Sequence, residues 1–329
     1  MKTQLISVLR GCLIAVALLG GSADLMAQAN WPTRPIRFLV GNSPGAAPDI
    51  VARILADQMS RALGQAWAVE NRPGADGMIA AEAVGRSQPD GYTLLLGSQG
   101  PMAIDMHLKK TVPVDSLKDF SHIAVIVDET TGMAVAVHPS LPVKTLAELV
   151  TYAKANPGKL SFSTTVAYGT MFGAWLAKTA GVDMVEVRYK VASQAVQDAV
   201  SGRVQVAFQS PAALGAQVKA GALRFLSVAT ARRIADWGEI PTVAETYANF
   251  SMRGFMILAG PAGIAKDIVQ RLNKEAATIA KDPKFMQDLA KIYWYNFEGA
   301  RTPEGTYEFV RRERETWGTF IRNIGIKPE

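Results

Sequence analysis

The chain has few of the residues that mark metal proteins and disulfide-bonded domains. It has one cysteine, Cys12, and three histidines in 329 residues. A single cysteine excludes both a disulfide framework and a zinc site of the CxxC type. The histidines, at 107, 122 and 138, lie too far apart in the sequence to indicate a metal cluster. We therefore expect neither a metal nor a cofactor.

Long apolar runs and blocks of one charge are also missing. After the N-terminus no segment reaches the roughly 18 uninterrupted apolar residues of a membrane span, so we expect a soluble mature protein. The net charge is only +6 and the basic residues are scattered, so we expect no nucleic-acid partner. The sequence has no P-loop, no H-E-x-x-H and no G-x-G-x-x-G after a predicted strand. Because 49% of the residues are hydrophobic, an extended disordered chain is excluded.

The first 29 residues have the pattern of a secretory leader. Lys2 and Arg10 make the start positive, a short apolar run follows from Cys12, and Ala27-Gln28-Ala29 has the small residues of a cleavage site. We expect cleavage before Asn30 and export to the periplasm. The mature chain then contains no cysteine, which suits an oxidising compartment.

Apolar runs typical of strands alternate with helical patterns through the mature chain. This alternation predicts an α/β protein whose sheets are mixed, mostly parallel and flanked by helices. We expect strands at 36–40, 66–70, 93–96, 123–127, 133–137, 160–163, 184–187, 204–208, 223–228 and 252–258. Helices are expected at 49–63, 77–85, 145–155, 170–179, 194–200, 212–220, 264–280 and 303–324, with a capping box at Thr145 to Glu148.

The alternation breaks near residues 130 and 235. These breaks predict two lobes, one built from residues 30–130 plus 236–329 and the other from residues 131–235. The segments 128–132 and 230–236 would then be hinges.

The segment Gly41-Asn42-Ser43-Pro44-Gly45 matches the G-x-S-x-G pattern of a nucleophile elbow. Three observations oppose a serine hydrolase. Pro44 lacks the N–H that such an enzyme offers to its oxyanion after the serine. No histidine follows residue 138, although the hydrolase order places its histidine late. The segment also follows the first strand instead of lying well inside the sheet order.

The same loop can also bind an anion. Gly45 and Ala46 allow a bound group to approach the backbone, and the helix that opens at Pro48-Asp49 directs its N–H groups and positive dipole end to that space. A carboxylate would be stabilised there. An ordinary βα turn with Asp49 in the first helical turn explains these residues equally well.

A second polar loop follows the strand at 160–163. It contains Thr165, Tyr168, Gly169 and Thr170, and so combines hydroxyl groups with the free N–H groups of a helix start. Two such loops, one in each lobe, could hold opposite ends of a small diacid between the lobes, at the carboxyl ends of the strands.

The chain resembles the periplasmic solute-binding proteins of tripartite tricarboxylate transporters, the Bug family. Matching segments are spread over most of the mature chain: Trp31-Pro-Thr-Arg-Pro-Ile-Arg37, Val69-Glu-Asn-Arg-Pro-Gly-Ala75, Pro89-Asp-Gly-Tyr-Thr-Leu-Leu-Leu96, Asp119-Phe120, His138-Pro-Ser-Leu-Pro-Val-Lys144, Asn156-Pro-Gly-Lys-Leu160, Gly202-Arg-Val-Gln205 and Ile240-Pro-Thr-Val-Ala-Glu245.

The resemblance implies a two-lobed, type II periplasmic binding fold that closes on a small carboxylated solute. It also implies delivery to a membrane transporter with a small and a large subunit, and we expect the binding protein itself to be a monomer. The alternatives are a sensor that signals to a membrane receptor and a serine hydrolase that uses Ser43. The usual glycine run after the first strand is reduced here to Gly45, followed by Ala-Ala-Pro. Tyr168 stands in the second loop, where it could stack on an aromatic acid, so both aliphatic and aromatic acids stay open.

Segments 190–193 and 208–210 fall where similar proteins line the cleft. We predict thirteen ligand-binding residues and no catalytic residue: Asn42, Ser43, Gly45, Ala46, Asp49, Ser98, Gln99, Thr165, Tyr168, Gly169, Thr170, Ser193 and Gln209.

Overall fold

The computed structural model describes residues 31–130, 133–165, 167–189, 191–230, 232–234, 237–248, 250, 252–292, 294–296 and 298–328. The predicted signal peptide, residues 1–29, lies outside these residues. So do residues 131–132 of the first predicted hinge, residues 231, 235 and 236 of the second, and residue 190 of the predicted cleft segment.

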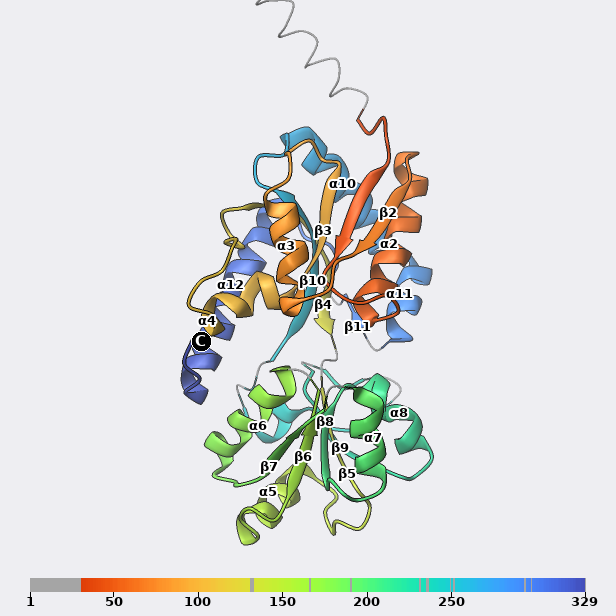
Figure 1. The fold of residues 1–329 in the computed structure, drawn as a ribbon. Coiled ribbons are helices and arrows are strands. Elements are labelled where there is room, and N and C mark those ends of the chain that lie inside the picture. Colours follow the sequence, from red (N-terminus) through yellow and green to blue (C-terminus); the bar gives the residue numbers. More distant parts are fainter. Residues whose placement is uncertain are drawn as a thin grey trace, which may run out of the picture.

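Within the described residues the strands form two separate sheets (Figure 1). The six-stranded sheet has the order β11 (Trp294–Tyr295), β4 (Phe120–Thr130), β10 (Gly254–Pro261), β3 (Thr93–Ser98), β1 (Ile36–Val40) and β2 (Trp67–Asn71). The five-stranded sheet has the order β7 (Val185–Arg188), β6 (Ser161–Thr164), β8 (Val206–Gln209), β5 (Ala134–Val137) and β9 (Arg224–Val228).

Helices flank both sheets, which confirms the predicted α/β class. The first sheet is surrounded by α2 (Ala47–Leu63), α3 (Met78–Gly85), α10 (Lys266–Ile279), α11 (Pro283–Ala290) and α12 (Pro303–Ile324) (Figure 1). The second is flanked by α5 (Leu146–Ala155), α6 (Ala167–Ala180), α7 (Ala192–Val200) and α8 (Pro211–Lys219). The shorter turns are η1 (Ala75–Gly77), a π-helical turn η2 (Gly100–Ile104), α4 (Asp105–Leu108) and α9 (Val243–Thr246).

Both sheets are mixed, as predicted, but parallel pairs are not in the majority. Among the described strands four neighbouring pairs are parallel and five are antiparallel. The chain passes from one sheet to the other after β4 and returns at β10. β10 enters the sheet from the end where β4 left it and inserts between β3 and β4, so it runs antiparallel to both. In the second sheet β5 inserts between β8 and β9 in the same way.

Local sequence signals explain where the helices begin and end. Helix α2 has a proline in its first turn and ends at Gly64, whose φ of 69° is the left-handed conformation that favours glycine. The Thr145 side chain caps α5 by accepting a hydrogen bond from the Glu148 N–H, as the sequence predicts. Thr302 caps α12 in the same way, through the Gly305 N–H.

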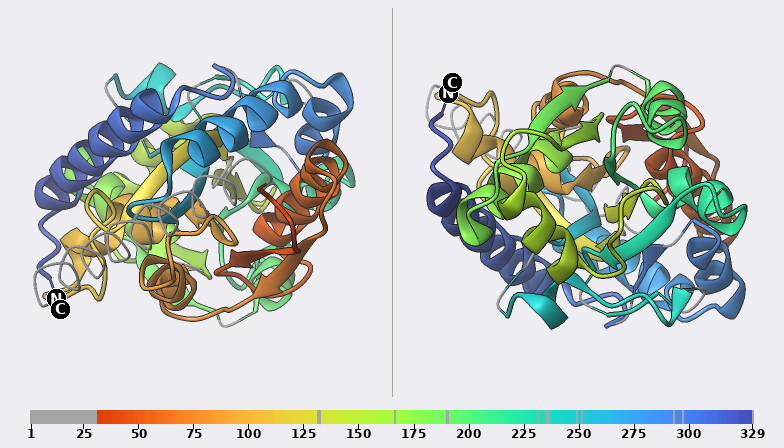
Figure 2. Two further views of the ribbon diagram at one scale, coloured as in Figure 1. Left: turned by 90° about the horizontal axis from the view of Figure 1, so that it is seen from above. Right: turned by 90° about the horizontal axis from the view of Figure 1, so that it is seen from below.

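Apolar residues are buried on both faces of the six-stranded sheet. Phe38 faces the cluster under α2 and α10, whereas its neighbour Leu39 faces the cluster under α3 and α12. This second cluster continues into the core between the five-stranded sheet, α5 and α6. The link includes Tyr168 of α6 and Trp317 of α12, whose ring centroids lie 5.5 Å apart. Helix α12, the dark blue helix in Figure 2, therefore packs against β4 of the six-stranded sheet and against α6, which flanks the five-stranded sheet.

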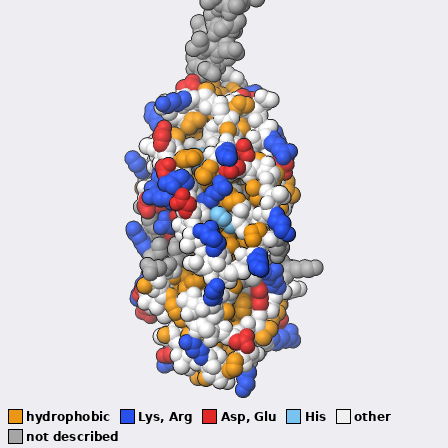
Figure 3. All heavy atoms as spheres, turned by 90° about the vertical axis from the view of Figure 1, so that its left-hand side faces the viewer, with side chains coloured by type: hydrophobic (Ala, Val, Ile, Leu, Met, Phe, Trp, Pro, Cys, Tyr) orange, Lys and Arg blue, Asp and Glu red, His pale blue; other side chains and the backbone are white. Residues whose placement is uncertain are grey.

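The net positive charge is not concentrated on the face drawn in Figure 3. There, lysine and arginine side chains are interspersed with acidic and neutral ones. Many arginines form ion pairs at the surface, as Arg311 does with Glu308 and Glu315 on α12. Within the described residues no helix has the length and apolar character needed to cross a bilayer.

Candidate ligand-binding site

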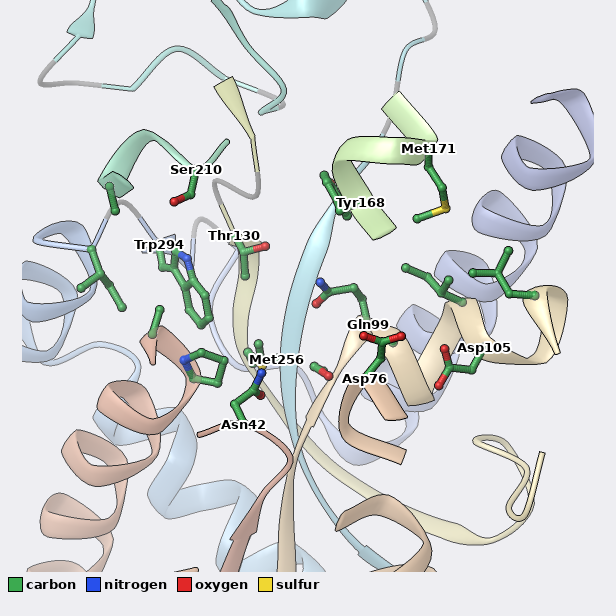
Figure 4. Close-up of a pocket in the computed structure, with 18 residues that line it drawn as sticks. Asn42, Asp76, Gln99, Asp105, Thr130, Tyr168, Met171, Ser210, Met256 and Trp294 are labelled. Atoms are coloured by element: carbon green, nitrogen blue, oxygen red, sulfur yellow. The ribbon is translucent and has the colours of Figure 1, made fainter. Parts of the chain in front are cut away.

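A cavity of about 310 Å³ is lined by residues at strand ends of both sheets (Figure 4). Its walls come from the carboxyl ends of β1, β3 and β4 in one sheet and of β8 in the other, together with the first turn of α6. Crevices at strand carboxyl ends are the usual ligand sites of open α/β sheets. The lining residues are Asn42, Ala47, Pro48, Asp76, Ser98, Gln99, Gly100, Ile104, Asp105, Leu108, Thr130, Tyr168, Met171, Ser210, Ala212, Met256, Ile292 and Trp294.

Close backbone packing shapes the floor of the cavity. A Cβ atom on Gly41 would overlap the Gly77 backbone, and one on Gly100 would lie 2.8 Å from the Asp76 carbonyl oxygen. The loops after β1 and β3 can therefore both pack against η1 because these positions carry no side chain. This packing brings Asp76 next to the Ser98–Gly100 segment.

The loop after β1 is a tight turn. The Ala46 N–H donates to the Ser43 carbonyl over 3.2 Å, with proline second and Gly45 third at a φ of 80°, which is typical of a type II turn. Ser43 is exposed on this turn and does not line the cavity. No histidine is among the described residues that line the cavity.

Asp49 holds this turn in place. Its carboxylate is 2% exposed and accepts hydrogen bonds from the Gly45 N–H at 2.8 Å, Arg53 Nε at 3.0 Å and Asn71 Nδ2 at 2.8 Å. Burial raises the pKa of Asp49, but these donors outweigh burial and leave the pKa below its ordinary value. Asn71 also donates to the Asn42 carbonyl, so the same network positions a residue of the cavity wall.

On the five-stranded side, Ser210 and Ala212 of α8 and Tyr168 and Met171 of α6 form the wall. The Ser210 hydroxyl caps α8 by accepting a hydrogen bond from the Ala213 N–H. The Thr165 hydroxyl donates to Gln209 Oε1 at 2.9 Å.

Thr170 and Gly169 have partners other than the cavity. The Thr170 hydroxyl donates to Glu186 at 2.5 Å and accepts from Arg188 Nη2 at 2.9 Å, which ties α6 to β7. A Cβ on Gly169 would lie 3.0 Å from the Thr164 side chain, so this glycine allows α6 to begin close to β6.

Two polar atoms of cavity-lining residues are buried without a hydrogen bond within the described part of the chain, Gln99 Oε1 and the Tyr168 hydroxyl. Such atoms are costly inside a protein unless a ligand or water satisfies them. Burial, with the carboxylates of Glu129 and Glu313 nearby, raises the pKa of Tyr168 well above its ordinary value. The phenol is therefore neutral at physiological pH and can donate a hydrogen bond.

Of the thirteen predicted residues, Asn42, Ser98, Gln99 and Tyr168 line the cavity. Gly45, Ala46 and Asp49 belong to the network beneath the wall, and Thr165 and Gln209 bond to each other behind it. Ser193 is exposed on the first turn of α7.

Sequence reasoning missed several lining residues, chiefly Asp76, Asp105, Thr130, Met256 and Trp294. Asp76 and Asp105 lie on η1 and at the start of α4, short turns without a periodic pattern. Asp76 directly follows the family-like segment that ends at Ala75, which was the one signal available for it. Trp294 belongs to an aromatic segment that is equally typical of core packing. No group of three potential metal-ligating residues occurs among the described residues.

Comparison with known proteins finds a matching family model, related sequences and solved structures of similar fold. The model of a family described as "Tripartite tricarboxylate transporter family receptor" (TctC) matches residues 51–326. A UPF0065 protein from the gbd 5′ region of Cupriavidus necator is 34% identical over 324 residues, which cover 96% of each chain.

Two solved structures have the same fold over nearly the whole chain. Rpa4515 of R. palustris, solved with adipate, has a TM-score of 0.79 and 28% identity, covering 91% of this chain and all of that one. The periplasmic binding protein BugD has a TM-score of 0.75 and 26% identity, with the same coverage. These findings confirm the predicted resemblance and the periplasmic binding protein fold.

Proposed function

Because this chain belongs to the tripartite tricarboxylate transporter receptor family, we propose that it binds a small carboxylated solute in the cavity between its two sheets. It then delivers this solute to a tripartite tricarboxylate-type transporter with a small and a large membrane subunit. The relative Rpa4515 was solved with adipate, which supports an organic acid as the ligand. The protein acts in the periplasm as a monomer, after removal of residues 1–29.

The observation that carries this proposal is the convergence of helix starts on one cavity. Ala47 and Pro48 at the start of α2, and Ser210 and Ala212 at the start of α8, lie on its wall. The N-cap residue of α2, Ala46, provides no capping side chain. The positive dipole ends of such helices, with the first-turn N–H groups that no side chain caps, stabilise a carboxylate without an arginine or lysine.

Ligand-gated closure is the proposed mechanism. One lobe comprises residues 30–130 plus 236–329 and the other residues 131–235, with hinges at 128–132 and 230–236. Asn42, Ser98 and Gln99 bind the solute from the first lobe, and Tyr168 and Ser210 bind it from the second. The ligand favours the closed state only by the difference between its affinities for the closed and open states.

A thermal-shift screen of residues 30–329 against organic acids, adipate among them, tests the proposal. The correct acid raises the melting temperature, and the stabilisation grows with RT ln(1 + [L]/Kd). Tyr168→Phe weakens the binding of that acid about fivefold, equivalent to about 1 kcal/mol, because it removes one buried donor. Tyr152→Phe, on the outer helix α5, is the matched control and leaves affinity unchanged.

Two results would contradict this function. The first is that no organic acid shifts the melting temperature. The second is steady hydrolysis of simple esters that Ser43→Ala abolishes, which would support the hydrolase instead.

A further inference from the structure

The cavity has an acidic corner, made of Asp76 and Asp105. Both residues line it on the side of the six-stranded sheet, and Figure 4 shows their carboxylates directed to the same side of the space. No lysine or arginine is among the described residues that line the cavity. A site for two carboxylates would be expected to avoid acidic walls, because like charges in a partly buried space repel each other.

Asp105 is buried but incompletely paired. Its side chain is 2% exposed, and Lys109, one turn further along, donates to Oδ2 at 3.1 Å. Lys109 itself does not line the cavity. Burial raises the pKa of Asp105, Lys109 partly offsets this, and the negative charge of Asp76 raises the pKa further. A buried carboxylate that the fold itself stabilises so weakly is typical of a residue with a ligand to bind.

Asp76 is placed by backbone packing instead of by a side-chain partner. It adopts a left-handed conformation with a φ of 56°, and its carbonyl oxygen packs against Gly100. Asp76 is exposed at the mouth of the cavity, and among the described residues its carboxylate has neither a hydrogen bond nor an ion pair.

Gln99 and Tyr168 give independent evidence for a ligand in this cavity. Gln99 precedes Gly100, the residue packed on Asp76, and its Oε1 is a buried acceptor that no described donor satisfies. Tyr168 is only 8% exposed, and its hydroxyl is the second buried atom without a hydrogen bond among the described residues. Figure 4 shows Gln99 between Tyr168 and Asp76. The corner itself offers the carboxylate oxygens of Asp76 and Asp105, which can accept the N–H donors of a protonated amine.

The opposite side of the cavity has a different character. Asn42, in the loop that leads from β1 to α2, and Ser210, the N-cap of α8, lie across the space from the two aspartates, with Met256 between (Figure 4). A carboxylate is favoured at those helix starts, an apolar chain beside Met256, and a cation at the acidic corner.

From this arrangement we propose that the preferred solute is a monocarboxylic acid that carries a protonated amine, held by Asp76 and Asp105, and not a plain dicarboxylate. The inference rests on the proposed function, because it uses the same cavity and the same carboxylate. It adds an ammonium subsite, which sets this chain apart from a relative that was solved with adipate.

Isothermal titration calorimetry with matched acids tests the subsite on residues 30–329. Adipate, hexanoate and 6-aminohexanoate have the same chain length and differ only at one end. Succinate, butanoate and 4-aminobutanoate repeat the comparison with a shorter chain. At one or both chain lengths the amino acid binds at least tenfold more tightly than the diacid. The affinity of the simple monocarboxylic acid, hexanoate or butanoate, lies between these two affinities.

Charge-removing variants then locate the subsite. Asp76→Asn and Asp105→Asn each reduce the preference for the amino acid over the diacid at least tenfold, partly by improving diacid binding. Asp267→Asn, on an exposed turn of α10 outside the cavity, leaves the preference unchanged and is the matched control. Improved diacid binding cannot result from misfolding, so it separates a charge effect from a structural one.

The outcomes separate the two proposals. If a diacid binds as tightly as its amino counterpart, or if neither aspartate variant changes the preference, the ammonium subsite is wrong and the carboxylate-binding function stands. If no acid of either series binds and the wider panel of organic acids also fails, the proposed function is wrong and the subsite with it.

Discussion

Two buried aspartates in equivalent local positions have opposite electrostatic situations. Asp49 lies in the first turn of α2 and Asp105 in the first turn of α4; both are 2% exposed, and both have a basic residue four positions later. Asp49 accepts three kinds of hydrogen bond, and its pKa is lowered. Among the described residues only Lys109 donates a side-chain hydrogen bond to Asp105, whose pKa is raised.

The difference shows how a structural carboxylate can be told from one that faces a ligand. Burial and an i,i+4 basic partner are common to both residues, so neither feature decides the role. The number of fixed donors decides it, because only Asp49 recovers in the folded protein the hydrogen bonds that it gives up in water. Asp105 lines a cavity, and its carboxylate can accept further hydrogen bonds from a ligand there.

The largest effect is expected from Asp49→Ala. The change leaves the Gly45 N–H, Asn71 and Arg53 without their common acceptor, so the free energy of unfolding falls by about 2–3 kcal/mol. Urea denaturation measures this loss. Asp57→Asn is the control, because the ion pair of Asp57 with Arg61 is also i,i+4 but exposed and contributes less than about 0.5 kcal/mol. Equal losses in the two variants would show that the Asp49 network has no special role.

A second effect is expected in the pH dependence of stability. The lowered pKa of Asp49 means that its contribution is present above its ordinary value of 3.8 and is lost as the pH falls through the folded-state pKa. The raised pKa of Asp105 has the opposite sign, so stability declines as the pH rises from 3.8 through the folded-state pKa.

Thermal melts of wild type and single Asn variants between pH 3 and 7 measure these slopes. Replacing Asp49 should flatten the fall in stability below pH 3.8, whereas replacing Asp105 should make stability rise more steeply with pH just above 3.8. If both replacements changed the slope of stability against pH in the same direction, the electrostatic distinction between Asp49 and Asp105 would be wrong.

The smallest effect is expected from Asp105→Asn in the absence of ligand at pH 7. The variant removes a charge that burial disfavours, so stability changes by less than about 1 kcal/mol, in the stabilising direction. Chemical denaturation of the ligand-free protein at pH 7 provides the measurement. A loss as large as that in Asp49→Ala would place Asp105 among the residues that hold the fold together.

Much of the fold could be predicted because its signals are local. The alternation of apolar runs with amphipathic segments places most of the strands and the long helices within a few residues, from β1 to α12. The insertion of β10 between β3 and β4 could not be predicted in this way. Strand order depends on which segments meet after the chain has crossed to the other sheet and returned, and periodicity contains no record of that.

The residues of the candidate site also differ in whether local sequence signals could predict them. Asn42, Ser98, Gln99 and Tyr168 could be predicted because each follows a predicted strand, where ligands of α/β sheets bind. Asp49 was placed in the same predicted set, yet its carboxylate bonds to Arg53 and to Asn71, which is far from it in sequence. The direction of a side chain depends on such distant partners.

By itself the sequence determined that the chain alternates strands and helices, that it resembles one family, and that polar loops follow its strands, because each of these is written in neighbouring residues. Only the tertiary structure decided which strands pair antiparallel, that Asp49 supports a turn and that Asp76 and Asp105 share a cavity. The physical reason is that charge repulsion, burial and hydrogen bonding act between atoms close in space, and here those atoms come from segments that the fold alone brings together.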